Sequence, residues 1–164
     1  MPITLIPMAL ADVENFRECM DAVARERSYI AITEAPAVHQ LQSQFRRGAE
    51  NGDVHIIARD EQQRVLGWAQ VQRGQGAAVA HRGDLGMGVH PDWRGQGLGK
   101  RLLSACVGTA GAKGINSIEL EVRCDNRSAL NLYRSLGFTM ESVVRDAMFI
   151  DGVFHNAFRM TLAL

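Results

Sequence analysis

Residues 94–100 read RGQGLGK, and residues 102–112, LLSACVGTAGA, follow them with the pattern of a helix. Three glycines at every second position stand in front of that helix, although glycine costs stability where the backbone must be fixed. A helix N-terminus carries unpaired amides and about half a positive charge, so a loop without side chains lets a phosphate approach it. Arg94 and Lys100 can add full charges. Read alone, the stretch fits a flexible turn as well as an anion site.

Two well-known nucleotide motifs do not match this spacing. A P-loop requires GxxxxGK[ST], but Arg94 stands at the position of the first glycine and Arg101 follows Lys100. A dinucleotide fingerprint requires GxGxxG, and Lys100 occupies its last position. We therefore exclude both types of nucleotide site.

The composition is that of an ordinary globular chain. Its 164 residues, 46% of them hydrophobic, predict a single domain over residues 1–164. Eighteen basic and eighteen acidic residues cancel, so we expect neither nucleic acid nor a membrane as a partner. The N-terminus lacks a signal-peptide pattern, and Cys19, Cys106 and Cys124 form no CxxC or Cys/His pairing. These features favour reduced thiols in the cytoplasm and no metal site, with Cys106 on an apolar helical face in the core.

Apolar periodicity predicts the order of elements along the chain. The first helix is expected to begin after Asp12, its N-cap, and the second to run from Val38 to Gly48 or Gly52. Two more helices are expected over 97–113 and within 126–138. Strands are expected at 3–6, 53–60, 64–72, 81–91, 118–122, 138–150 and 153–164. Asp151 and Gly152 form a hairpin turn between the last two strands. The order β-α-α-β-β-β-α-β-α-β-β predicts an α+β fold, with a single mixed, mostly antiparallel sheet of six or seven strands flanked by helices.

Two motifs in this order resemble those of a known family. Arg94-x-x-Gly97-x-Gly99, after a strand and opening a helix, resembles the acetyl-CoA loop Q/R-x-x-G-x-G/A of the GNAT superfamily of N-acetyltransferases. About thirty residues on, Asn126-x-x-Ala129-x-x-Leu132-Tyr133-x-x-x-Gly137-Phe138 is similar to the second cofactor motif of that family. The order of helices and strands predicted above is also similar to that of the family over nearly the whole chain. The stretches YIAITEAP and RDAMFIDGVFHNAFRM also resemble the first interhelical loop and the closing hairpin of single-domain bacterial members.

The resemblance implies acetyl-CoA as the acetyl donor. Its pyrophosphate would lie on the backbone of the loop formed by Arg94, Gly95, Gln96, Gly97, Leu98, Gly99 and Lys100. Met87, Gly88 and Val89 would receive the pantetheine arm where the fourth and fifth strands splay apart, and Asn126, Ala129 and Tyr133 would complete the cofactor site. Gly86 and Gly88 fit a β-bulge or simple tight packing.

The resemblance also implies direct attack of a primary amine, from a small molecule or a peptide, in a ternary complex. Tyr133 matches the general acid of the family, and a core tyrosine is the other interpretation. The Gly88 or Val89 amide would stabilise the oxyanion. For the base that deprotonates the amine we expect Glu34, in the ITEAP loop, and Asp84, His81 and His155 remain alternatives.

Four further points stay open. A non-catalytic acyl-CoA sensor would keep the glycine loop without a proton donor, but Tyr133 argues against it. A protein N-terminus or a lysine could be the acceptor. The exposed edges of the last hairpin are compatible with a homodimer. Tyr29, Trp68 and Phe154 could line an acceptor pocket or belong to the core.

Overall fold

A computed structural model describes residues 2–164. Its helices are α1 (Val13–Ala24), α2 (Val38–Asn51), α3 (Leu98–Ala112) and α4 (Arg127–Ser135), with two 3-10 turns at Leu10–Asp12 and Pro91–Trp93. Its strands are β1 (Thr4–Pro7), β2 (Val54–Arg59), β3 (Val65–Arg73), β4 (Arg82–Val89), β5 (Ser117–Arg123), β6 (Thr139–Ile150) and β7 (Val153–Ala163). The predicted α+β class and the order of elements are confirmed, and the strands form one seven-stranded sheet.

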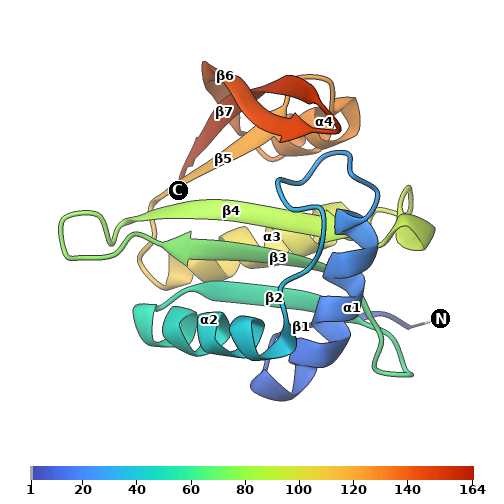
Figure 1. Cartoon of the computed structure of the whole chain (residues 1–164). Helices are drawn as coiled ribbons and strands as arrows, with labels where there is room; N and C mark the ends of the chain where they lie inside the picture. The colour runs from blue at the N-terminus through green and yellow to red at the C-terminus, as the bar shows by residue number, and fades with distance from the viewer. Residues whose placement is uncertain (1) are drawn as a thin grey trace.

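The sheet consists of two antiparallel halves joined by one parallel pair. Its strand order is β1-β2-β3-β4-β5-β7-β6, and β4 and β5 are the parallel neighbours (Figure 1). Their register covers only Arg82 with Ser117, Gly83 with Ile118, and Asp84 with Glu119. Beyond Asp84 the two strands are not paired, whereas β5 stays paired with β7 as far as Arg123. The splay that the resemblance implies is therefore present.

The predicted bulge at Gly86 and Gly88 is wrong. β4 pairs with β3 from Gly83 to Val89 without a shift of register. A Cβ added at Gly88 would lie 2.3 Å from the Trp68 ring, so glycine stands there because the indole packs against the strand. Of the two sequence-based interpretations, tight packing is the correct one at Gly88.

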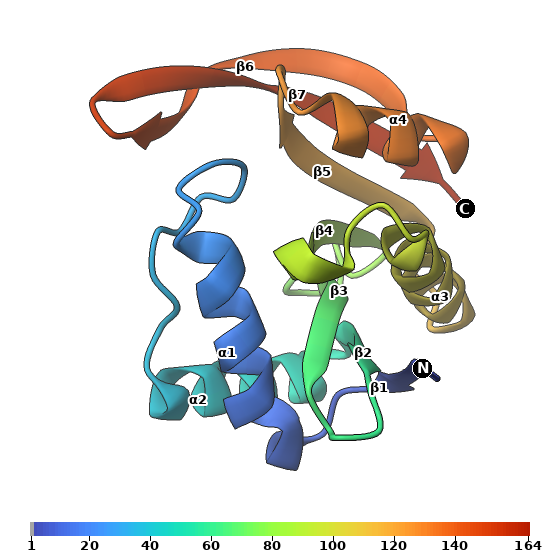
Figure 2. The same ribbon diagram turned by 90° about the vertical axis from the view of Figure 1, so that its right-hand side faces the viewer.

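Helices cover both faces of the sheet, and each face has its own core. α1 and α2 lie on one face and α3 on the other (Figures 1 and 2). Under α1 and α2, Phe16, Leu41 and Trp68 belong to one buried cluster. Under α3 and α4, Leu102 and Cys106 belong to the other, so Cys106 is a core residue as predicted.

Asp12 occupies the N-cap position of α1, as predicted, but its side chain does not cap the helix. It has a helical backbone conformation and makes no side-chain capping bond to α1. Its carboxylate instead accepts a hydrogen bond from the Ala9 amide at 2.8 Å and one from Arg59 Nη1 at 3.0 Å. The side chain therefore fixes the chain entering α1 and ties it to β2.

Candidate active site

The glycine loop in front of α3 leaves its backbone accessible. Gly95 and Gly97 have φ angles of 73° and 79°, in the left-handed region that glycine adopts without strain. A Cβ added at either would find no atom within 4 Å. Gly97 is the N-cap of α3 and provides no side-chain cap, so the first amides of the helix are left for another acceptor. Leu98 turns its side chain into the core, and its backbone alone faces the loop.

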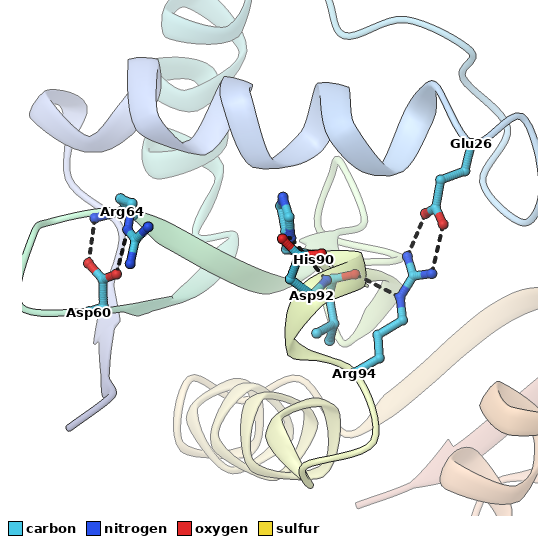
Figure 3. A network of polar contacts seen from close by, with 7 residues as sticks. Glu26, Asp60, Arg64, His90, Asp92 and Arg94 are labelled. Atoms are coloured by element: carbon cyan, nitrogen blue, oxygen red, sulfur yellow. Dashed lines mark hydrogen bonds and ion pairs between the residues drawn. The ribbon is translucent and has the colours of Figure 1, made fainter. Parts of the chain in front are cut away.

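The Arg94 side chain has protein partners, contrary to its expected role as a free charge. Its Nη1 and Nη2 donate to the Glu26 carboxylate at 2.9 and 2.6 Å, and its Nε donates to the Val89 carbonyl at 3.0 Å (Figure 3). Figure 3 also shows His90, whose Nδ1 accepts the Asp92 amide at 3.2 Å in the turn before the loop. Arg94 therefore fastens the loop to the end of α1 and to β4.

The three segments expected to bind the cofactor meet at Gly99. A Cβ there would lie 3.4 Å from Leu132 on α4 and 3.6 and 3.7 Å from Met87 and Val89 on β4. The N-terminus of α3, the unpaired end of β4 and α4 thus lie together. Lys100 is exposed beside them.

Tyr133 lies on the buried side of α4. The helix begins at Asn126, whose Oδ1 accepts the Ala129 amide at 3.2 Å, so Asn126 is the N-cap. The Tyr133 side chain is buried, with its ring 5.8 Å from that of Phe138. Burial raises the pKa of Tyr133 to about 12, so the hydroxyl keeps its proton at neutral pH. Such a group can donate a proton but cannot serve as a base.

Sequence reasoning missed an acidic cluster on the α1/α2 face at the base of the splay. Asp84, Glu119, Glu121 and Arg159, with Leu85 and Leu120, line a hollow of about 400 Å³, which we call the acidic hollow. Partial burial, with the hydrogen bond and negative charge of Glu119, raises the pKa of Asp84. Alternation in SIELEVR could have indicated that Glu119 and Glu121 share a face, but their closeness to Asp84 follows from the register of β4 and β5.

Glu34 stands apart from the residues that line the acidic hollow. Its carboxylate is 68% exposed and lies 3.5 Å from Arg25 Nη2. His81, before β4, is exposed, and His155 faces Met148 across the last hairpin. Of the four bases considered from the sequence, Asp84 is the one that the fold places beside other carboxylates.

The segment between α1 and α2 is fastened to the β5–β7 half of the sheet. The Arg27 guanidinium lies 2.6 Å from the Asp151 carboxylate at the tip of the β6–β7 hairpin. Arg123, at the end of β5, donates to the Ser28 carbonyl and lies 5.0 Å from the centre of the Tyr29 ring. Figure 2 shows this segment rising toward the hairpin. Of the predicted pocket aromatics, Trp68 is buried, and Tyr29 and Phe154 are 45% and 61% exposed.

Comparison with known proteins identifies the class to which this fold and this loop belong. The model of the acetyltransferase (GNAT) family matches residues 16–138. The chain therefore belongs to the acetyltransferase (GNAT) family, whose enzymes use acetyl-CoA.

Curated relatives are enzymes with different acceptors. The chain is 29% identical over 126 residues to the ribosomal protein bS18-alanine N-acetyltransferase of Escherichia coli K12, covering 73% of this chain and 84% of that protein. It is 38% identical over 86 residues to the mycothiol acetyltransferase of Arthrobacter sp. FB24. That match covers 51% of this chain but only 27% of the relative, so the chain spans about a quarter of the length of that enzyme.

Solved structures share the fold over the whole chain. A GNAT superfamily phosphinothricin acetyltransferase from Sinorhizobium meliloti, in complex with AcCoA, has a TM-score of 0.90 and 24% identity, covering 100% of this chain and 89% of that one. A GNAT acetyltransferase from Streptococcus pneumoniae has a TM-score of 0.91 and 20% identity, covering 99% and 100%.

Over residues 2–164, no helix has the length and hydropathy needed to cross a membrane. In the same range, no three His, Cys, Asp or Glu side chains gather as a metal site would require.

Proposed function

We propose that the protein transfers acetyl from acetyl-CoA to a primary amine of a small molecule or a peptide, by direct attack in a ternary complex. The observation that carries the proposal is the meeting of the glycine loop, the unpaired end of β4 and α4 around Gly99. These segments hold every residue proposed for the cofactor site, from Met87 to Val89, from Arg94 to Lys100, and at Asn126, Ala129 and Tyr133.

The cofactor fits the loop through its backbone. The open space beside Gly95 and Gly97 is where a phosphate would reach the first amides of α3. Because the Glu26 carboxylate and the Val89 carbonyl accept hydrogen bonds from the Arg94 guanidinium, Arg94 orders the loop, and the exposed Lys100 can bring a positive charge to the phosphate. The edge of Met87 to Val89 that β5 leaves unpaired offers backbone groups other than the Val89 carbonyl to the pantetheine arm.

The reaction requires a proton acceptor, an oxyanion donor and a proton donor. Acetyl-CoA supplies a thioester whose carbonyl the neutral amine attacks. On this proposal the Gly88 or Val89 amide donates to the developing oxyanion. Tyr133, whose hydroxyl is protonated at neutral pH, gives its proton to the departing thiolate.

We place the base in the acidic hollow. Asp84 on β4 and Glu119 and Glu121 on β5 face the splay, where a thioester on β4 would be open to attack from the α1/α2 side. Glu121 lies past Glu119, the last residue of β5 that pairs with β4, and its Oε1 accepts a hydrogen bond from Arg159 Nη2 at 2.8 Å. Glu34, the base expected from the sequence, stays a prediction, and it lies outside the acidic hollow.

We also propose that the protein forms a homodimer and is located in the cytoplasm. β6 is an edge strand, and Met140 and Val143 on it are 47% and 53% exposed, which supports a homodimer. Cys19, Cys106 and Cys124 are free thiols, which favours a reducing compartment.

The test is an acceptor screen that follows the release of free CoA, with amino acids, amines and peptides in parallel. We expect release with at least one amine class and loss of release in Tyr133→Phe. Calorimetric binding of acetyl-CoA without thiol release on any amine would instead favour the non-catalytic sensor.

A further inference from the structure

A second cavity lies on the α1/α2 face, away from the glycine loop. α2 covers it, β2 and β3 form its floor, and Thr109 and Lys113, from the C-terminal end of α3, also line it. Its volume is about 360 Å³, and apolar walls come from Phe16, Met20, Leu41 and Phe45. We call it the α2 pocket. A space of this size and lining is typical of a site for a small molecule or part of one.

One residue that lines this pocket has a buried polar atom without a hydrogen-bond partner. His55 projects from β2, and its Nε2 is buried without a hydrogen bond. The Phe16 ring stands edge-on to the imidazole at 4.8 Å, and the Phe45 ring lies 6.4 Å away. Burial lowers the pKa of His55 to about 4, so the ring is neutral at pH 7. A buried nitrogen without a partner costs free energy, and a ligand that bonds to it would remove that cost.

The charged side chains at the pocket make hydrogen bonds within the protein. Asp53 Oδ1 accepts from Asn51 Nδ2 at 3.1 Å and from the Arg73 amide at 2.9 Å. Lys113 Nζ donates to the Asp53 carbonyl at 3.4 Å. Because these charged groups already have hydrogen-bond partners in the protein and the walls are apolar, the pocket favours an uncharged occupant.

The α2 pocket and the acidic hollow are neighbours on the sheet. Gln70 and Gln72 line the pocket, and their cross-strand partners on β4 are Gly86 and Asp84. Directly opposite residues of antiparallel strands project to the same face, so Gln72 stands beside Asp84. At Gly86 no side chain intervenes, since a Cβ there would have only Gln70 Cγ, at 4.0 Å, as a neighbour.

We propose that the α2 pocket binds a small uncharged apolar group, aromatic or branched aliphatic, that carries one hydrogen-bonding atom for His55 Nε2. The group has two potential sources. It is the far end of the acceptor amine, which rests on the proposed function, or it is a separate small molecule.

Benzyl alcohol is the probe, because it combines a ring with one hydroxyl group. We expect a saturable shift of the His55 imidazole ¹⁵N and ¹H signals, which a His55→Phe variant assigns. Ala49→Trp, which places an indole at the lining of the pocket, should weaken binding at least tenfold. Glu50→Trp is the control, since Glu50 is exposed on the same helix and outside the lining. Melting curves confirm that both variants fold.

Absence of a saturable shift in the wild-type protein, or equal binding by Ala49→Trp and Glu50→Trp, would overturn the proposal. To separate the two sources, acetylation of 4-phenylbutylamine and butylamine is compared. If the pocket holds the acceptor, Ala49→Trp lowers kcat/KM at least tenfold for the aryl amine only, and benzyl alcohol competes with it. If the occupant is separate, both amines respond alike. A His55 shift without acetylation of any amine would refute the proposed function and leave the pocket standing.

Discussion

Replacing Gly97 by alanine separates the cost of backbone strain from the loss of a phosphate site. With φ at 79°, an alanine would be held in the left-handed region at roughly 1–2 kcal/mol. Alanine also lowers the conformational entropy of the unfolded chain relative to glycine, and this offsets about 0.4–1 kcal/mol of the strain. The net loss of about 1 kcal/mol corresponds to a fall in Tm of about 2–4 °C for a chain of this size.

The effect on acetyl-CoA should be much larger. The new methyl group projects into the space that has no atom within 4 Å, where the phosphate is proposed to lie. Losing two amide bonds to a charged group, each worth about 1.5–3 kcal/mol, weakens binding by about 10²- to 10⁴-fold. Isothermal titration calorimetry with acetyl-CoA measures the affinity directly.

Gly152→Ala is the matched control. Gly152 has a φ of 78°, and a Cβ there also finds no atom within 4 Å, but the residue lies in the β6–β7 turn. It should lose similar stability and keep its affinity for acetyl-CoA. Affinity of Gly97→Ala within threefold of wild type, together with the expected fall in Tm, would refute the assignment of the loop as the phosphate site.

Three further predictions concern the chemistry. Tyr133→Phe should lower kcat by about 10²-fold or more while leaving acetyl-CoA affinity unchanged, and wild-type turnover would remove Tyr133 from the acid role. The pKa of Asp84 is raised in the folded protein, so the protonated carboxyl group contributes to the free energy of unfolding. This contribution is fully present below the ordinary pKa of 3.8 and is lost as pH rises through the folded-state pKa. Asp84→Asn should therefore raise Tm by about 1–3 °C at pH 7, and the gain is small because the carboxyl group is exposed to solvent. At pH 3 the same substitution should leave Tm unchanged. An equal gain in Tm at both pH values would contradict the like-charge contact with Glu119. Burial raises the pKa of Cys19 and Cys106 to about 12, so intact-mass spectrometry after mixing with acetyl-CoA alone should find no acetyl adduct, and a stoichiometric adduct would exclude direct transfer.

Local sequence signals predicted most of the fold. The glycines before α3, the alternation in β5 and the Asp151–Gly152 turn each depend on neighbours along the chain, and the structure has them as expected. The expectations that were wrong depended on distant partners. Asp12 bonds to Arg59 rather than capping its helix, and Gly88 makes room for Trp68 rather than forming a bulge.

In the candidate site, too, continuous segments could be predicted from the sequence, and contacts between distant residues could not. The loop and the α4 motif could be read from residue types and spacing, because each is a continuous segment. The acidic hollow could not, since its carboxylates come together only through the short parallel register of β4 and β5. Glu26 was missed for a related reason, as it meets Arg94 across 68 positions of the chain. Periodicity does not encode such pairings.

The Glu26–Arg94 pair has a kinetic consequence for ligand association. Holding a residue in one backbone conformation costs about 1–2 kcal/mol of entropy, and here the ion pair orders the start of the loop during folding. Acetyl-CoA then meets a preorganised loop, and stopped-flow traces should show one phase whose rate rises linearly with cofactor concentration. Arg94 and Glu26 are 44% and 31% exposed, so salt screens their attraction. At high ionic strength the loop loses part of this order, and a slow, concentration-independent phase should emerge.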